Sequence, residues 1–265
     1  MISGIPVKTK DFTWEANLNF TRIRSKVTSL GEGVGNIQLG GFGGSDGVYL
    51  YKDKPYGILY GLAYQRNDKG QIEVDDDGIP ISTTENQEVG NTNPDFTAGF
   101  FNTFTYKKLS LSFLFDWKKG GDVVNLDGHY MWFYGTSKVT EQGREAPFVV
   151  PNSVYASDGK ANTTAITAQD YWPAVSNISE AYVEDGTYIK LRTVSLAYTL
   201  GENMKKSPFK SLTISAGANN LWIHAPHYTS GDPEANITGG SNGQGITNFA
   251  APTSRSYIVG IKATF

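Results

Sequence analysis

Apolar and polar residues alternate with a period of two along several stretches of this chain. The last stretch, residues 255–265, reads RSYIVGIKATF. One side of an extended strand would there carry Tyr257, Val259, Ile261, Ala263 and Phe265. This alternation predicts a strand whose two faces meet different solvents. Two interpretations are open: the last strand of a soluble β-sandwich, or an outer-membrane barrel strand that places Phe265 in an aromatic girdle.

Five earlier stretches alternate in the same way, namely 11–27, 90–106, 109–117, 188–200 and 211–223. The apolar side of the first consists of Phe12, Trp14, Ala16, Leu18 and Phe20. Only Lys107 and Lys108 separate the second stretch from the third. This spacing predicts a tight hairpin of two strands of about ten residues, a length that spans a bilayer when tilted. Residues 2–11, which include Gly4 and Pro6, predict a turn.

The connections between these stretches alternate between long and short. They are long at 28–96, short at 107–108, long at 119–187, short at 201–210 and long at 223–254. The Gly-rich residues 28–54 and the polar residues 118–186 are expected to be irregular loops. Two soluble sheets have no reason to place every long loop at one end. Outer-membrane barrels have one rim of short turns and one of long loops, so the pattern favours the barrel.

Composition narrows the class of protein further. The chain has 265 residues with 30 Gly and 13% aromatic residues, which suits strands and turns better than helices. Its net charge of −3 favours neither nucleic acid nor an acidic membrane surface as a partner. No apolar run of about 18 residues predicts a transmembrane helix, which leaves barrel strands open. The first residues show no signal-peptide pattern, so we expect a cytosolic chain, a fragment or a mature piece.

The sequence offers little support for catalysis. The absence of Cys excludes disulfides, Cys-based metal sites and Cys nucleophiles. His224 and His227 have no third ligand nearby, and the contiguous Asp75, Asp76 and Asp77 lack the alternating spacing of a calcium loop. No Gly-x-Ser-x-Gly nucleophile motif occurs. We therefore expect no enzyme, no metal and no cofactor.

Aromatic residues are the better candidates for a function in binding. Five of them lie in the long stretch 118–186 and could stack on sugar rings: Tyr130, Trp132, Tyr134, Tyr171 and Trp172. Alternatively, they pack this segment onto itself or onto a partner. A second set is expected to face lipid or form the girdles: Trp14, Phe100, Phe104, Phe113, Trp117, Tyr198, Tyr257 and Phe265. In a sandwich, the apolar strand faces would instead pack on each other.

Several stretches together resemble one known family. They are KPYGILYGLAY (54–64), residues 90–123, YIKLRTVSLAYTL (188–200), LTISAGANNLWI (212–223), GDPE (231–234) and SRSYIVGIKATF (254–265). In order and spacing they are similar to the carboxy-terminal part of SusC/RagA-type TonB-dependent outer-membrane transporters. The resemblance extends over most of the chain.

The resemblance implies an all-β fold: an antiparallel transmembrane β-barrel segment formed by the last strands of a large plugged barrel, with long outer loops and short periplasmic turns. Residues 1–265 would be its carboxy-terminal part, with the plug domain and the amino-terminal strands outside the sequence. Implied partners are a SusD-like surface lipoprotein, TonB through the missing amino-terminal part, outer-membrane lipid, and a glycan or oligopeptide substrate. The expected location is a Bacteroidetes-like outer membrane, with Phe265 as the barrel-assembly signal. A carbohydrate-binding sandwich is the alternative.

Overall fold

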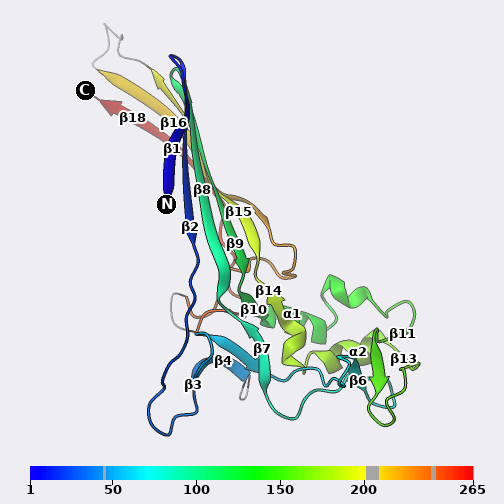
Figure 1. Ribbon diagram of the computed structural model, residues 1–265. Helices are drawn as coiled ribbons and strands as arrows, with labels where there is room; N and C mark the ends of the chain where they lie inside the picture. Colours follow the sequence, from blue (N-terminus) through cyan, green and yellow to red (C-terminus); the bar gives the residue numbers. More distant parts are fainter. Residues whose placement is uncertain (44–45, 201–208, 240–242, 265) are drawn as a thin grey trace.

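The computed structural model describes residues 1–43, 46–200, 209–239 and 243–264, and it has two parts (Figure 1). One is a long antiparallel sheet, and the other is a module of short strands and helices at one end of the sheet. The sheet contains, in spatial order, β1 (Ile2–Lys8), β2 (Phe12–Thr21), β8 (Pro94–Tyr106), β9 (Leu109–Gly120), β15 (Tyr188–Leu200), β16 (Ser211–His224) and β18 (Ser256–Thr264).

Six of these seven strands coincide with the alternating stretches of the sequence, and their prediction is confirmed. The exception is β1, because residues 2–11 were expected to form a turn and that expectation is wrong. Pro6 is tolerated because β1 is an edge strand, where a missing N–H group need not pair. The pairing of β1 with β2 also shifts register between Gly4 and Val7, on either side of the proline.

The register gives the sheet one apolar face. Directly opposed residues of antiparallel strands point to the same side. One row therefore crosses the whole sheet through Val7, Trp14, Phe104, Leu111, Leu196, Ala216 and Val259. The neighbouring row on the other side runs through Thr13, Thr105, Ser110, Ala197, Ser215 and Gly260. The predicted separation of apolar and polar faces is confirmed.

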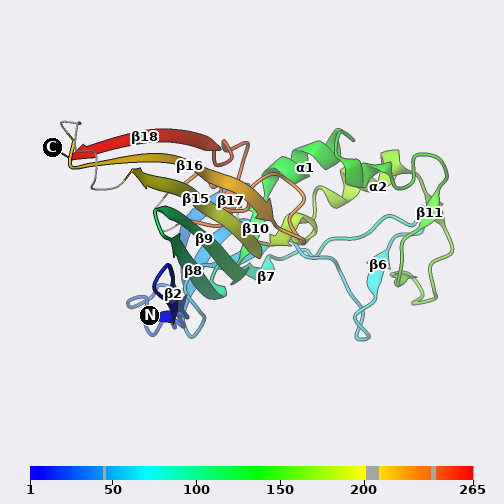
Figure 2. The same ribbon diagram turned by 90° about the horizontal axis from the view of Figure 1, so that it is seen from above.

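Much of this apolar face is exposed. Val259 keeps 80% of its surface accessible, and Trp117, Tyr198 and Tyr257 are also exposed. Within the described residues, β1 and β18 are the two edges of the sheet and do not pair with each other. The sheet is thus open and curved, as Figure 2 shows, with no second sheet among the described residues packed against its apolar face. The core expected of a β-sandwich is not formed there.

The ends of the sheet differ as the connection lengths predicted. The short links at residues 9–11 and 107–108 lie at one end, and the module lies at the other (Figure 1). Lys107 adopts a positive φ of 52° in its two-residue turn. The short connection at 201–210 falls mostly outside the described residues. Every described long connection therefore extends from the same end of the sheet.

Residues 28–54 and 118–186 were expected to be irregular loops, and that expectation is wrong, because the long connections contain regular elements. They contain a four-stranded sheet of β3 (Asn36–Gly43), β4 (Asp46–Tyr51), β5 (Ile58–Gly61) and β7 (Gln87–Asn91). A second sheet has β14 (Val183–Asp185), β10 (Asp122–Asn125) and β17 (Ile246–Thr247). The remaining pairs are β6 (Ile72–Val74) with β12 (Ser153–Tyr155), and β11 (Phe148–Val149) with β13 (Ala165–Ile166). Helical elements are α1 (Leu126–Phe133), η1 (Lys138–Glu141), α2 (Ala168–Val175) and η2 (Ser179–Tyr182).

The module has its own hydrophobic core, built from segments that are far apart in the sequence. Its buried members are Val48, Leu59, Val124, Leu126, Trp132, Trp172, Val175, Tyr182 and Ile246. Both α-helices start at a capping side chain, because Asn125 accepts the Gly128 N–H and Thr167 accepts the Asp170 N–H. Among the described residues, no helix is long and apolar enough to cross a membrane.

Candidate functional site

The five aromatic candidates for ligand binding come together on α1 and α2. Tyr130 and Trp132 lie in α1, Tyr134 follows it, and Tyr171 and Trp172 lie in α2. The ring centroids of Trp132 and Trp172 are 5.8 Å apart, and those of Tyr171 and Trp172 are 5.0 Å apart. The sequence predicted these residues individually, and the fold places them in one region of the module.

The five rings differ sharply in exposure. Trp132 and Trp172 are only 7% and 9% exposed and belong to the module core, whereas Tyr134 is 72% exposed. Trp172 is also fixed by a hydrogen bond from its Nε1 to the Gln142 carbonyl at 3.2 Å. Packing of the segment onto itself therefore accounts for most of the tryptophan surface. Binding by the five rings stays a prediction, and Tyr130 and Tyr134 have the most free surface for it.

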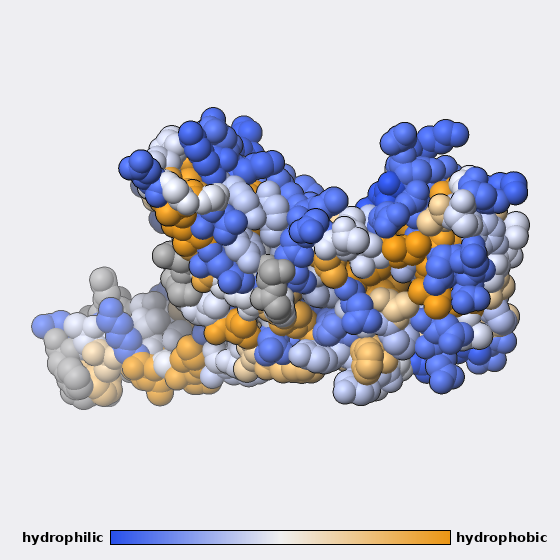
Figure 3. Space-filling view, turned by 90° about the horizontal axis from the view of Figure 1, so that it is seen from below, coloured by the Kyte–Doolittle hydropathy of each residue, from blue (hydrophilic) through white to orange (hydrophobic). Residues whose placement is uncertain are grey.

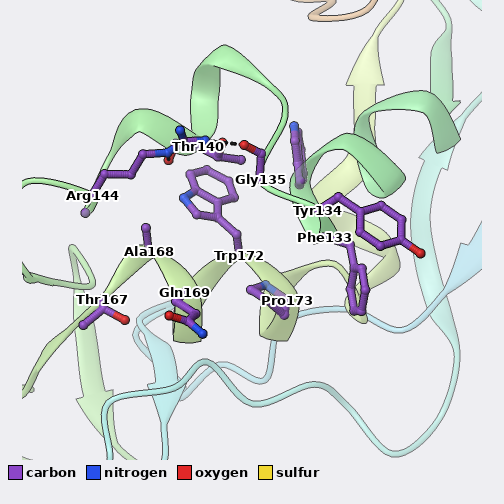
Figure 4. A pocket seen from close by; sticks show the side chains of 12 residues that line it. Phe133, Tyr134, Gly135, Thr140, Arg144, Thr167, Ala168, Gln169, Trp172 and Pro173 are labelled. Carbon is purple, nitrogen blue, oxygen red and sulfur yellow. Dashed lines mark hydrogen bonds between the residues drawn. The ribbon is translucent and has the colours of Figure 1, made fainter.

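A pocket of about 470 Å³ opens between α1, η1 and α2 (Figure 4). Figure 4 shows the ring of Trp172 between Thr140 on one side and Pro173 on the other, with Tyr134 farther along the rim. Arg144 and Gln169 add polar groups to its lining. The lining thus combines groups that can form hydrogen bonds with aromatic rings that can stack on a ligand.

Arg144 is held in place by the turn that it borders. Its Nε donates to the Thr140 carbonyl at 2.8 Å, and its Nη2 donates to Thr140 Oγ1 at 2.7 Å and to the Gly135 carbonyl. Gly135 has a positive φ of 65°, which a glycine adopts without strain. No sequence pattern marks Arg144, because its neighbours are ordinary loop residues.

A second cluster of functional groups lies on the polar face of the sheet, where strands meet residues 225–255. This connection between β16 and β18, of which residues 240–242 lie outside the described part, is called the 225–255 segment below. Lys190 of β15 donates to both carboxylate oxygens of Asp232 at 2.6 and 2.8 Å and also pairs with Glu234. Arg192 bridges Glu234 and Asp116, with its Nε 2.7 Å from Asp116. The GDPE stretch thus supplies two carboxylates to this cluster.

The cluster is largely shielded from water. Lys190 is only 2% exposed, and Asp232 is buried as well. The hydroxyls of Tyr188 and Thr253 complete it by donating to Glu234 at 2.6 Å and to Asp232 at 2.5 Å. A buried ammonium is tolerated only when it is paired, so the cluster anchors the 225–255 segment to the polar face.

The two segment carboxylates are held in their ionised form. Burial raises the pKa of Glu234, but hydrogen bonds from Arg192, Lys190 and Tyr188 outweigh burial and lower that pKa to about 2. For Asp232, burial again raises the pKa, and hydrogen bonds from Lys190 and Thr253 leave it below its ordinary value. Both groups therefore carry a negative charge throughout the neutral range.

The remaining site expectations concern metals and lipid. In the described part of the chain, no group of three or more His, Asp or Glu side chains is arranged to hold a metal ion. Seven of the eight expected lipid-facing residues share the apolar face: Trp14, Phe100, Phe104, Phe113, Trp117, Tyr198 and Tyr257. Phe265 lies outside the described residues. Contact of this face with lipid stays a prediction.

Comparison with known proteins finds relatives along the whole chain. No family model matches it. TonB-dependent receptor P3 of Formosa agariphila is 27% identical over 295 residues, which cover 100% of this chain and 28% of that protein. TonB-dependent receptor P26 of the same organism is 27% identical over 286 residues, covering 98% of this chain and 28% of that protein. The chain spans little more than a quarter of the length of these curated relatives.

Solved structures give the same picture of the fold. The RagAB peptide importer in its "open-open" state matches with a TM-score of 0.68 at 19% identity, and in its "closed-closed" state with 0.66 at 20%. Each match covers 99% of this chain and 28% of the other. The resemblance of the sequence to the carboxy-terminal part of SusC/RagA-type TonB-dependent receptors is thereby confirmed.

Proposed function

We propose that residues 1–265 form the carboxy-terminal wall and an outer module of a TonB-dependent importer in a Bacteroidetes-like outer membrane. The seven-stranded sheet would be one arc of a large transmembrane barrel. Plug domain and remaining strands, including the part that contacts TonB, would come from outside this sequence. The likeness to receptors and importers, rather than to enzymes, supports a role in nutrient uptake.

The exposed apolar face of the sheet is the observation that carries this proposal. Each large apolar side chain left in water forgoes about 1.5–3 kcal/mol of burial energy. The exposed ones here include Leu111, Phe115, Trp117, Leu196, Tyr198, Ile214, Val259 and Ile261. Seen from the module end, apolar surface follows the projecting strands (Figure 3). Lipid would cover this face, and the opposite polar face would line a wet lumen.

Barrel closure is part of the proposal. An open sheet edge in lipid leaves backbone N–H and C=O groups unpaired, at a cost of several kcal/mol for each group. β1 and β18, the two edges among the described strands, would therefore pair with strands that this sequence does not include. We expect residues 1–265 alone not to transport a substrate.

The module would lie outside the cell, because it extends from the long-loop end of the sheet. There it would contact a SusD-like surface lipoprotein and the substrate, a glycan or an oligopeptide. The exposed Tyr130 and Tyr134 would contribute to this contact. Trp132, Tyr171 and Trp172 pack on one another in the same module and would contribute less. The described residues offer no arrangement that we would assign to catalysis.

Two neighbouring residues of β9 test the proposal. Phe113 lies on the apolar face and Ser112 on the polar face, and the chain has no native Cys. Single Phe113→Cys and Ser112→Cys variants would be made in the protein as the cell produces it and labelled in outer-membrane vesicles. We expect a water-soluble maleimide to label position 112 and not 113, and a lipid-soluble maleimide to label position 113.

The opposite result has a clear meaning. If position 113 is protected from both reagents and the protein is soluble without detergent, the apolar face is covered by protein. The carbohydrate-binding sandwich would then be the better interpretation. If the water-soluble reagent labels both positions, the face is in contact with water and the barrel proposal is wrong.

A further inference from the structure

Helix α1 runs past three adjoining pockets. Besides the 470 Å³ pocket already described, there is one of about 420 Å³ and one of about 200 Å³. The first two pockets share Tyr134 in their lining, and the second and third share Met131 and Phe249. Since each pocket shares lining residues with the next, the three lie side by side along α1, and together they are called the α1 groove below.

The middle of the α1 groove is apolar and rich in aromatic rings. Its lining consists of Tyr130, Met131, Tyr134, Thr136 and Phe249. The rings of Tyr130 and Phe249 stack with centroids 5.9 Å apart, although one belongs to α1 and the other to the 225–255 segment. Both rings remain exposed, so their free faces are open to a ligand.

The two ends of the groove carry opposite charges. Arg144 lines the pocket at one end, and neither its guanidinium nor the carboxylate of Asp127, at the other end, makes an ion pair with a described residue. Asp127 accepts one hydrogen bond, from the Phe249 N–H, through Oδ1. Asp232 also reaches the Asp127 end, but both of its carboxylate oxygens already accept hydrogen bonds from Lys190. The apolar centre thus has the Arg144 cation on one side and the Asp127 anion on the other, and both are available to a ligand.

Resting on the importer function proposed above, we propose that the α1 groove binds a short peptide with free termini. The peptide's amino group would pair with Asp127, its terminal carboxylate with Arg144, and its apolar side chains would lie on Tyr130 and Phe249. Eight helical residues make α1 about 12 Å long, and an extended peptide advances about 3.3 Å per residue. An extended peptide therefore needs about four residues to run the length of α1, whereas a neutral glycan has no charge for either end.

The charged ends can be tested on the unaltered protein. The probe is a pentapeptide of alanine and leucine with free termini, titrated into the whole detergent-purified protein by calorimetry. Acetylation of its amino terminus and amidation of its carboxy terminus each remove one ion pair, and we expect each to weaken binding about tenfold. Equal binding of all three peptides would overturn the proposal, as would preferential binding of maltopentaose.

Variants assign each charge of the peptide to one end of the groove. Asp127→Asn keeps the oxygen that accepts the Phe249 N–H and removes the charge, and Arg144→Gln removes the cation. We expect Asp127→Asn to weaken binding of the free peptide about tenfold and to leave the acetylated peptide unaffected. We expect Arg144→Gln to weaken binding of the free peptide about tenfold and to leave binding of the amidated peptide unaffected.

Matched controls and an independent readout complete the test. Asp158→Asn and Lys69→Gln remove the same charges from exposed turns outside the groove, and we expect neither to change binding. If Asp127→Asn weakens the free and acetylated peptides equally, the assigned pairing is wrong. Labelling at positions 112 and 113 does not involve the groove, so a failure here is distinguishable from a failure of the importer function.

Discussion

Replacing Lys190 by methionine tests whether the buried ion cluster holds the 225–255 segment on the sheet. The change removes an ammonium that is 2% exposed and leaves Asp232 and Glu234 without their shared cation. Removing one partner from a buried ion pair costs about 3–5 kcal/mol. Arg192 continues to pair with Glu234, so we expect the lower end of this range, about 3 kcal/mol.

Amide hydrogen exchange measures this loss where it occurs. If the cost falls on local opening of the 225–255 segment, exchange of its protected amides should accelerate on the order of a hundredfold. The central strands β9 and β15 should keep their protection, because their ladder hydrogen bonds do not depend on Lys190. The measurement requires the whole protein in detergent, followed by peptide-resolved mass spectrometry.

Lys119→Met is the matched control, because Lys119 forms a longer ion pair of 3.8 Å with Asp185 and both side chains are more exposed. Exposed pairs contribute about 0–1 kcal/mol, so exchange should barely change. In the Lys190→Met background, Asp232→Asn together with Glu234→Gln removes the uncompensated charges and should restore part of the protection. Unchanged exchange in Lys190→Met, or an equal effect of Lys119→Met, would refute the anchoring role.

Three further outcomes follow from the structure. Because the pKa of Glu234 is lowered from 4.5 to about 2, its contribution to stability is present above pH 4.5 and is lost as the pH falls towards 2. The rate at which pepsin cleaves the 225–255 segment, divided by its rate on an unstructured reference peptide at the same pH, should therefore be higher at pH 2 than at pH 4.5, and equal ratios would contradict this. Trp14→Phe leaves the buried Asn102 amide without its 3.0 Å partner and should lower the free energy of unfolding by about 1–3 kcal/mol, measured by urea denaturation in detergent against Phe12→Leu. Gly47→Ala places a methyl group 2.3 Å from the Gly40 carbonyl oxygen and should destabilise the β3–β4 hairpin by about 1 kcal/mol or more. Amide hydrogen exchange in this hairpin should then be faster than in the wild type.

The long sheet could be predicted from the sequence because most of its strands carry a visible pattern within their own residues. In β2 and β9, alternate residues meet different surroundings along ten or more positions, so a period of two is visible without knowledge of the fold. β1 was missed because Pro6 and Gly4 are common turn residues. Its strand conformation comes from pairing with β2, which is a tertiary effect.

The module could not be predicted in this way because its strands are short and their partners are distant. β17 has two residues and pairs in parallel with β10, which lies far earlier in the chain. Two residues cannot display a period, and a parallel partner leaves no hairpin signal. The same limit applies to the candidate site: ring types are visible in the sequence, but the burial of Trp132 and the exposure of Tyr134 follow from the core that the module forms.

The 225–255 segment connects the sheet, the module and the α1 groove. Asp232 is held by Lys190 on the polar face, Thr229 donates its N–H to Glu184 of β14 at 2.7 Å, and Phe249 stacks on Tyr130. A ligand that presses on Phe249 therefore acts on the same stretch of backbone that the buried ammonium anchors. If a ligand in the α1 groove stabilises the 225–255 segment, then releasing that segment from Lys190 must weaken ligand binding by the same coupling free energy. Lys190→Met should thus lower the affinity for the peptide, although Lys190 does not line the α1 groove. If the groove were independent of the sheet, the affinity would not change.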